Sequence, residues 1–137
     1  MERTFAVIKP DAFEAGKAGD ILARIYREGF QVVGLKKLCL SRKQAAGFYH
    51  VHQDKPFFED LVGFMSSGPC LVMVLEAPEA IRRWRDLMGA TNPDDAAPAT
   101  LRKEFGASIG RNAVHGSDAP ETAAFEIGYF FAGLELI

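Results

Sequence analysis

Residues 112–118 read Asn-Ala-Val-His-Gly-Ser-Asp and hold the side chains of this sequence best suited to covalent chemistry. They place His115, one of only three histidines, between an amide and a hydroxyl and directly before a glycine. An imidazole is the side chain best able to act as a nucleophile or base near neutral pH. The adjacent glycine lacks the Cβ that would crowd an incoming group. This pattern predicts covalent catalysis at His115.

Several side chains elsewhere in the sequence are suited to binding phosphate groups and a base. Arginine forks match phosphate oxygens in pairs, and a threonine hydroxyl adds a neutral donor. Lys9 stands before Pro10 at the end of the first predicted strand, where it adds a point charge, and Phe57 offers a flat apolar surface for stacking. The polar candidates in the weakly periodic region before His115 are Arg85, Thr91, Arg102 and Arg111.

Each of these residues also has an ordinary structural interpretation. A lone loop histidine is more often solvated than catalytic, arginines on one helix commonly form a solvated face, and Phe57 would by default be a core residue. His50 and His52 lie two apart near a predicted helix end without a supporting group, and we assign them no role. Together, however, the candidates predict a pocket for phosphate and base around a nucleophilic His115.

Other catalytic and binding classes lack their signatures. A P-loop is excluded because Pro69-Cys70 stands where that motif needs lysine and a hydroxyl, and no Gly-x-Ser-x-Gly nucleophile elbow occurs. Two cysteines are too few for a closed zinc site. A net charge of −2 argues against dedicated nucleic-acid binding. The longest apolar run, residues 70–75, is too short to cross a bilayer.

The 137 residues predict one domain that spans residues 1–137, with ordinary globular composition. The N-terminus runs directly into a strand-like segment without a signal-peptide pattern. Cys39 and Cys70 both lie in apolar segments that are typical of strands. Buried, reduced thiols are therefore expected, in keeping with a cytoplasmic protein.

Hydrophobic patterning divides the sequence into strands and helices. Strands are predicted over residues 4–8, 31–40 and 70–75, and a short apolar segment ends at His115. The run 70–75 is continuously apolar, which predicts a central strand covered on both faces. Helices are predicted from Asp20 to Gly29, from Pro56 to Ser67, from Pro78 to Met88 and around residues 100–105. The capping-box pair Ser41 and Gln44 predicts a further helix that runs towards His50. The last helix is predicted from Asp118 onwards, and its core-facing residues are Ala123, Ala124, Ile127 and Phe131. This order predicts an α+β fold, a split βαββαβ sheet with helices packed on one face.

The sequence resembles the nucleoside diphosphate kinases over essentially its whole length. The most specific element is Asn-x-x-His-Gly-Ser-Asp at residues 112–118, and its spacing to the other shared segments agrees. Those segments are Thr-Phe-Ala-Val-Ile-Lys-Pro-Asp at 4–11, Lys-Pro-Phe-Phe at 55–58, Ser-Gly-Pro at 67–69, Met-Gly-Ala-Thr-Asn-Pro at 88–93 and Glu-Ile at 126–127. The resemblance implies a ferredoxin-like fold with a four-stranded antiparallel sheet and helices packed against it.

The resemblance also implies an activity. The γ-phosphoryl group of a nucleoside triphosphate, mainly ATP, would pass to a nucleoside diphosphate by a ping-pong mechanism. It would travel through a phosphohistidine, here at His115, with broad base and sugar specificity. The implied cofactor is Mg²⁺, held through the phosphates of the nucleotide rather than by a cage of protein ligands.

The site residues of the family carry over position by position. Lys9 and Tyr49 would position the transferred phosphate, with Lys9 also near the ribose hydroxyl. Glu126 would accept a hydrogen bond from one imidazole nitrogen and leave the other free to attack, with support from Ser117. The remaining roles are binding of the other phosphates by Arg85, Thr91 and Arg102, stacking of the base between Phe57 and Ile109, and binding of the ribose 3′-hydroxyl by Asn112.

The resemblance further implies a homo-oligomer, a tetramer or a hexamer built from dimers. The sequence ends at Ile137 without the longer tail through which some members contact a neighbouring subunit, so the two assemblies stay open. Three rival interpretations also remain: a phosphohistidine carrier for a protein partner, an RNA-binding βαββαβ module, and a non-catalytic regulatory homologue. The carrier leaves Phe57 and Ile109 without a purpose, and the RNA-binding module rests on fold analogy alone. Every expected catalytic position is filled, which argues against the regulatory homologue.

Overall fold

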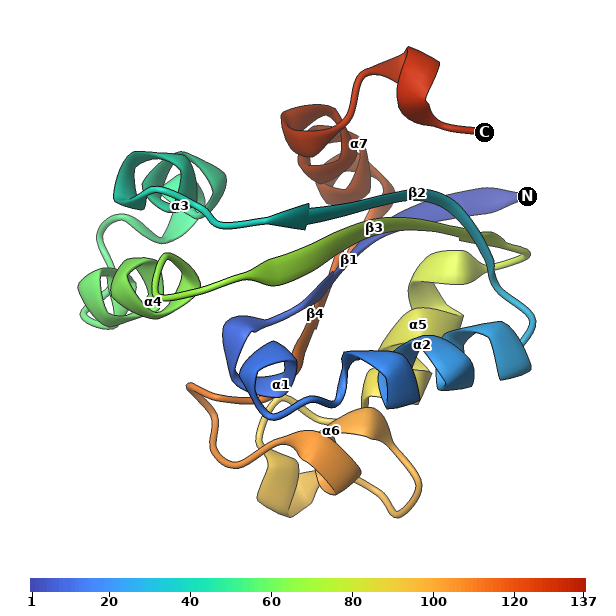
Figure 1. The fold of residues 1–137 in the computed structure, drawn as a ribbon, viewed down its shortest axis with the longest axis horizontal. Coiled ribbons are helices and arrows are strands. Elements are labelled where there is room, and N and C mark those ends of the chain that lie inside the picture. The colour runs from blue at the N-terminus through green and yellow to red at the C-terminus, as the bar shows by residue number, and fades with distance from the viewer.

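A four-stranded antiparallel sheet forms the centre of the molecule, in a computed structural model that describes residues 1–137. The strands are β1 (Glu2–Ile8), β2 (Gln31–Leu38), β3 (Cys70–Ala77) and β4 (Val114–Gly116). They lie in the order β2-β3-β1-β4, and each neighbouring pair is antiparallel (Figure 1). This arrangement confirms the predicted ferredoxin-like fold.

Helices connect and flank the strands. The α-helices are α1 (Pro10–Glu14), α2 (Ala18–Arg27), α3 (Arg42–Phe48), α4 (Phe58–Met65), α5 (Ala80–Met88), α6 (Leu101–Phe105) and α7 (Pro120–Phe130), and the 3₁₀ turns are η1 (His50–His52), η2 (Pro93–Asp95) and η3 (Gly133–Glu135). The capping box that opens α3 is confirmed. The Ser41 hydroxyl accepts from the Gln44 N–H at 3.0 Å, and the Gln44 side chain accepts from the Ser41 N–H at 2.9 Å.

Two predicted helix starts are displaced by a few residues. Asp20 lies in the first turn of α2, whose cap is Lys17. Asp118 lies before Ala119, which is the cap of α7. The Thr122 hydroxyl accepts from the Ala119 N–H at 3.0 Å and donates to Asp118 at 2.8 Å. Cap preferences locate these helices correctly but do not fix their first residue.

Helices cover both faces of the sheet, so the expectation that they pack on one face is wrong (Figure 1). One core cluster joins Ile8 and Met73 of the sheet to residues of α2 and α5, among them Trp84. The other joins Phe5 and Val72 to residues of α3, α4 and the end of α7. The central strands β1 and β3 are buried almost continuously, and a strand of that kind needs cover on each side.

The short strand β4 lies at one edge of the sheet and pairs with β1. The pairing sets His115 opposite Val7, and just beyond it the Lys9 N–H donates to the Ala113 carbonyl at 2.9 Å. Side chains directly opposite each other in a pair point to the same face. His115 therefore points to the face that α3, α4 and α7 cover, and the end of β1 lies beside it. The prediction that His115 lies near a strand end is confirmed.

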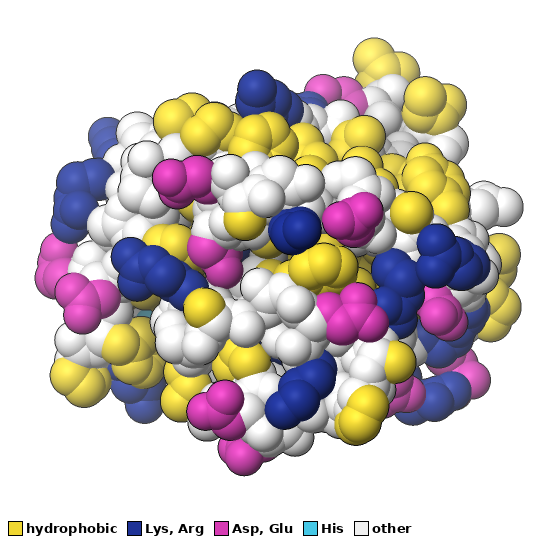
Figure 2. Space-filling view, turned by 60° about the horizontal axis from the view of Figure 1, so that its bottom comes forward, with side chains coloured by type: hydrophobic (Ala, Val, Ile, Leu, Met, Phe, Trp, Pro, Cys, Tyr) yellow, Lys and Arg dark blue, Asp and Glu magenta, His cyan; other side chains and the backbone are white.

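Two burial predictions are wrong. Cys70 is buried, but Cys39 follows the last residue of β2 and is exposed. In α7, Ala124 is exposed while Ala123 is buried. On the face shown in Figure 2, Lys and Arg side chains alternate with Asp and Glu, so that face carries no extended basic surface. None of the helices combines the length and apolar character that crossing a bilayer requires.

Candidate active site

His115 lies in an aromatic recess with one-fifth of its side chain exposed. Its ring makes edge-on contacts with Phe48 at 5.5 Å and Tyr49 at 6.2 Å between centroids. Burial lowers the pKa of His115 below its ordinary value of 6.5, although Glu126 opposes part of this shift. The imidazole is therefore neutral at neutral pH, as a nucleophile must be.

Glu126 and Ser117 fix the orientation of that imidazole. The Nε2 atom of His115 lies 2.9 Å from Glu126 Oε1, and the same oxygen accepts from the Ser117 hydroxyl at 2.9 Å. A carboxylate only accepts hydrogen bonds, so Nε2 carries the proton and Nδ1 presents its lone pair. Ser117 is itself anchored to β1, because its Oγ accepts from the Phe5 N–H at 3.3 Å. The site thus brings together three predicted residues: one from β4, one from the segment that follows it and one from α7.

Lys9 and Asn112 form a buried pair beside β4. The Lys9 ammonium donates to Asn112 Oδ1 at 2.9 Å, and the Asn112 amide donates to the Thr91 carbonyl at 3.1 Å. Burial, together with the nearby Arg102 guanidinium, lowers the pKa of Lys9 to about 8. An anionic ligand would stabilise the charged form of Lys9 strongly, because its negative charge offsets both the burial and the repulsion by Arg102.

Arg102 is buried with part of its hydrogen-bonding capacity unused. It donates to the carbonyls of Gly89 at 2.9 Å and Val114 at 3.0 Å, which fastens the outer edge of β4 to the chain after α5. Its buried Nε–H has no partner. Burial and the nearby Arg85 lower the pKa of Arg102 to about 10. Arg102 therefore has a structural role that sequence reasoning did not anticipate, in addition to a donor left for a ligand.

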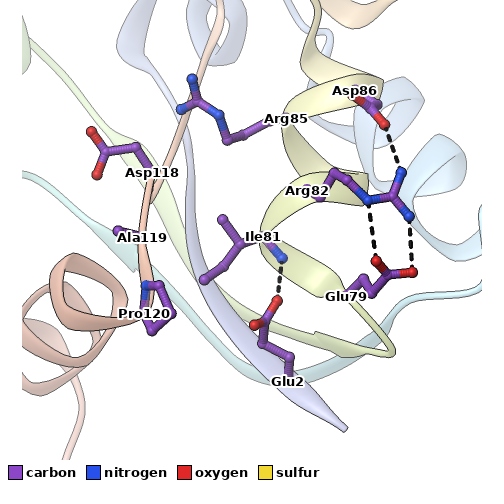
Figure 3. A pocket seen from close by; sticks show the side chains of 9 residues that line it. All are labelled: Glu2, Glu79, Ile81, Arg82, Arg85, Asp86, Asp118, Ala119 and Pro120. Carbon is purple, nitrogen blue, oxygen red and sulfur yellow. Dashed lines mark hydrogen bonds and ion pairs between the residues drawn. The ribbon is translucent and has the colours of Figure 1, made fainter.

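Arg85 and Asp118 border a surface hollow between α5 and the start of α7. In Figure 3, Arg85 reaches from α5 towards the chain segment that links β4 to α7. Its neighbours on the helix are engaged elsewhere, since Arg82 pairs with Glu79 at 2.9 Å and Asp86 at 3.4 Å. Arg85 is exposed and so remains available to an anion.

Tyr49 presents an unpaired hydroxyl beside the imidazole. The residue is buried, its Oη has no hydrogen-bond partner, and burial raises the pKa of its phenol. A buried hydroxyl without a partner is uncommon in folded proteins and indicates a place where a ligand or water binds. The Tyr49 and His115 rings lie 6.2 Å apart between centroids, so this free hydroxyl belongs to the same recess as the imidazole.

The two residues predicted to hold the base are both exposed. Phe57 is 48% and Ile109 is 60% accessible, and the Phe57 ring lies 5.6 Å from the His52 ring. Exposed apolar side chains of this size are suited to stacking against a ligand. Arg111, another candidate cation, lies with its guanidinium 4.9 Å above the Phe64 ring.

A strained turn links Asn112 to the strand that carries His115. Ala113 has a φ of 73°, and the Val114 N–H donates to the Asn112 carbonyl at 2.9 Å across it. Such a three-residue turn with positive φ is rare and strained for a residue with a side chain. The Ala113 N–H donates to Asp11 Oδ2 at 3.1 Å. Sequence reasoning assigned no role to Asp11, since no local pattern links residues 102 positions apart.

Gly116 serves packing rather than the access of an incoming group. A Cβ at this position would lie 2.6 Å from Nε1 of Trp84 and 2.7 Å from the methyl of Met88. Trp84 also donates from Nε1 to the His115 carbonyl at 3.1 Å. The glycine therefore allows α5 to lie directly on β4, which corrects the reason given for it above. The sequence offers no sign of the Trp84 contact.

The donor set at the site suits phosphates better than a metal cage. No group of three His, Cys, Asp or Glu side chains is arranged to hold a metal ion. The polar groups that converge near His115 are Lys9, Arg102, Tyr49 and Asn112, and all of them can donate to phosphate or ribose oxygens. A divalent ion would accordingly be held through a ligand's own phosphates.

Comparison with known proteins agrees with this chemistry. The sequence model described as nucleoside diphosphate kinase matches residues 2–136. Nucleoside diphosphate kinases of Syntrophotalea carbinolica and Desulfotalea psychrophila are 80% and 70% identical over 137 residues, covering all of both chains in each case. The fold also matches solved structures. The nucleoside diphosphate kinase of Aquifex aeolicus has a TM-score of 0.98 at 47% identity, with 99% of each chain covered. That of Halobacterium salinarum, in complex with CDP, has a TM-score of 0.95 at 43% identity, covering 99% of this chain and 91% of the other.

Proposed function

The chain belongs to the nucleoside diphosphate kinase family, enzymes that transfer the γ-phosphoryl group of a nucleoside triphosphate to a nucleoside diphosphate, and we propose that His115 carries the group between the two nucleotides. The observation that carries this proposal is the 2.9 Å contact between His115 Nε2 and Glu126, because it leaves Nδ1 as the free nucleophile.

Both half-reactions use the same atom. The Nδ1 lone pair attacks the γ-phosphorus, the N–P bond forms, and the P–O bond to the leaving diphosphate breaks. The proton on Nε2 stays in its hydrogen bond to Glu126, which offsets the positive charge that develops on the ring. In the second half-reaction a terminal phosphate oxygen of the acceptor attacks the phosphorus and the N–P bond breaks. The imidazole is thereby regenerated without any net proton transfer to the protein.

The surrounding donors act by placement and charge neutralisation, which dominate phosphoryl transfer. We assign the transferred group to Lys9 and to the unpaired Tyr49 hydroxyl. The free Nε–H of Arg102 and the exposed Arg85 and Thr91 bind the other phosphates. Lys9 and Arg102 are already held by hydrogen bonds before the nucleotide arrives, so little reorganisation of these two cations opposes the reaction.

Recognition of the nucleoside uses fewer polar contacts. Asn112 binds the ribose 3′-hydroxyl through its amide, and Phe57 and Ile109 stack on the two faces of the base. The CDP complex of the Halobacterium salinarum relative supports nucleotide binding by this fold. Stacking without hydrogen bonds to the base accepts purines and pyrimidines alike. ATP is therefore proposed as the main donor because it is available to the enzyme, and not because the site selects adenine.

We extend the proposal to the cofactor and the assembly. Nucleotide kinases generally use a divalent metal, and Mg²⁺ bound to the nucleotide phosphates fits a site rich in cations. It would supply charge neutralisation between the phosphates. We also propose that residues 1–137 act as one catalytic domain within a tetramer or hexamer built from dimers. A cytoplasmic location, where the free thiols of Cys39 and Cys70 persist, belongs to the same proposal.

Intact-mass measurement after brief incubation with ATP and Mg²⁺ tests the proposal. A single acid-labile phosphate should appear on the wild-type chain and on the matched control His50→Ala, and it should be absent from His115→Ala. Addition of GDP should discharge it and produce GTP. Phosphate that forms but stays on the protein would instead favour a carrier, and no phosphate at all would leave a nucleotide-binding protein without this chemistry.

A further inference from the structure

The segment that follows β1 holds the strained turn beside the catalytic histidine from both sides. The Lys9 N–H donates to the Ala113 carbonyl at 2.9 Å, and Asp11 Oδ2 accepts from the Ala113 N–H at 3.1 Å. Both backbone polar groups of Ala113 are therefore bound by residues 9–11. Ala113 is fully buried, so no solvent replaces either bond if it is lost.

Ala113 does not favour the conformation that these bonds impose. Its φ of 73° lies in the left-handed region, which a residue with a Cβ rarely adopts. Strain of this kind persists only where the surrounding structure holds it. The Lys9 contact belongs to the backbone and survives any side-chain substitution. The Asp11 carboxylate is the only side chain that hydrogen-bonds to the backbone of Ala113 itself.

The turn separates two groups that must act together on a nucleotide. Asn112 lies on one side of Ala113, with its side chain bound to Lys9, and His115 lies two residues beyond on the other side. A relaxation of Ala113 to negative φ would rotate the peptide groups on both sides. The side chain of Asn112 and the ring of His115 would then move relative to each other.

We propose that Asp11 is a positioning residue for phosphoryl transfer, which holds Ala113 in its left-handed turn so that Asn112 and His115 meet the same nucleotide. This inference rests on the proposed function of His115. Asp11 makes no hydrogen bond to the imidazole or to the groups assigned to the phosphates. Its charge favours the charged form of Lys9, and its one side-chain hydrogen bond runs to the backbone of Ala113. Its second oxygen, Oδ1, is buried without a hydrogen-bond partner, so the bond to Ala113 is the only hydrogen bond that holds the carboxylate in place.

Substitution of Asp11 should impair both binding and chemistry. Asp11→Ala should lower kcat and raise the KM for the nucleoside diphosphate, with a combined loss in kcat/KM of roughly 10–100-fold. The matched control is Asp20→Ala, because Asp20 also lies in the first turn of a helix and is exposed. Asp11→Asn keeps an oxygen that can accept from Ala113 and should lose less than about threefold.

A glycine at position 113 tests whether Asp11 acts by holding the backbone of residue 113 at positive φ. Glycine adopts positive φ about as readily as negative φ, so the turn no longer needs its clamp. Asp11→Ala combined with Ala113→Gly should therefore recover to within about threefold of Ala113→Gly alone. A variant that is merely less stable would not regain both kcat and KM in this way.

Three outcomes would overturn the inference. The kcat/KM of Asp11→Ala could be no lower than that of Asp20→Ala, or Ala113→Gly could fail to restore it. The third is an Asp11→Asn variant whose kcat/KM is as low as that of Asp11→Ala. Thermal unfolding of each variant identifies any that fails to fold. If Asp11→Ala does not fold, the kinetics of Asp11→Asn and of the double variant Asp11→Ala with Ala113→Gly test the inference. Failure of the proposed function looks different, since the wild-type chain would then form no phosphohistidine or His115→Ala would still transfer phosphate.

Discussion

Glu126 reaches back from the second turn of α7 to His115 on β4, with 2.9 Å between its Oε1 and the imidazole Nε2. The contact fixes both the tautomer and the rotation of the ring. Glu126→Gln keeps the size of the side chain but offers an amide that can point its N–H₂ at Nε2. We expect a loss of roughly 10–100-fold in the rate of His115 phosphorylation, as for other partners that orient a histidine.

Single-turnover kinetics with ATP measure this loss directly. Ser117→Ala is the comparison, because Ser117 binds the same Glu126 oxygen but not the ring. Its effect should be the smaller of the two. An unchanged phosphorylation rate in Glu126→Gln would remove Glu126 from the mechanism.

The pH dependence of kcat/KM should show two limbs, because this ratio reports the free enzyme. On the acid side, the rate should fall as His115 becomes protonated, at a pH below its ordinary pKa of 6.5 since burial lowers that pKa. On the basic side, Lys9 loses its charge near its pKa of about 8. Bound phosphate favours the charged lysine, so the basic limb of kcat should lie at higher pH than that of kcat/KM.

Lys9 also links stability to pH. Its folded pKa of about 8 lies below the ordinary value of 10.5, so between these pH values the unfolded chain binds more protons than the folded one. The free energy of unfolding from this group therefore rises with pH across that window. Cys70 and Tyr49, whose pKa values burial raises, contribute in the opposite sense in the same window. Lys9→Met should therefore make the change in the free energy of unfolding between pH 8 and pH 10, measured by urea titration, less positive than in the wild-type chain, and an equal change in both proteins would contradict the assignment.

Base specificity should be broad. Phe57 and Ile109 are exposed apolar surfaces, and stacking on them is worth roughly 1–3 kcal/mol per base whatever the base is. The kcat/KM values for ADP, GDP, CDP and UDP should therefore lie close together. A purine-to-pyrimidine ratio above about 10³ is more than stacking can explain and would indicate a polar contact to the base.

Gly116 should not tolerate a side chain. A Cβ there would overlap Trp84 and Met88, both fully enclosed in the core between α5 and β4. Gly116→Ala should lower the free energy of unfolding by about 1–3 kcal/mol, the usual cost of overpacking. Gly19→Ala is the matched control, since no atom lies within 4 Å of its Cβ position in α2. It should leave stability unchanged or raise it, and equal effects at both glycines would rule out the overlap.

Ala99 is a second alanine in the left-handed region, with a φ of 69°. Its carbonyl accepts from Arg24 at 2.6 Å, which holds the loop before α6 against α2. Ala99→Gly should raise the free energy of unfolding by roughly 0.5–1 kcal/mol, because glycine carries no steric penalty at this φ. Ala97→Gly in the same loop has no positive φ to relieve and should lower it. Urea unfolding of the two variants decides, and a shift of the same sign in both would contradict the strain at Ala99.

Local patterns in the sequence predicted most of the fold. The Ser41 and Gln44 capping box and the apolar run that became β3 depend on neighbours a few residues away, and both are confirmed. The continuous apolar run of β3 also predicted cover on both of its faces, but which helices supply that cover and the exposure of Cys39 depend on how distant segments pack. Spacing along the chain does not encode those relations.

The site divides in the same way. His115 and its cationic neighbours were visible as residue types suited to phosphate, and the family resemblance added Tyr49 and Glu126. Asp11 and Trp84 act on Ala113 and His115 through backbone groups, and a backbone group carries no sequence signal of its own. Only a structure reveals contacts of that kind.

The pairing of β1 with β4 has a consequence for how the protein is made. It joins Phe5 and Ser117, which are 112 residues apart, so its loop-closure entropy is among the largest in the fold. A chain emerging from the ribosome has its lysine-bearing first strand long before its histidine strand. Until β4 arrives, one edge of β1 presents unpaired N–H and C=O groups, the kind of edge that promotes aggregation of folding intermediates. Recovery of phosphoryl transfer during refolding therefore marks the closing of this edge.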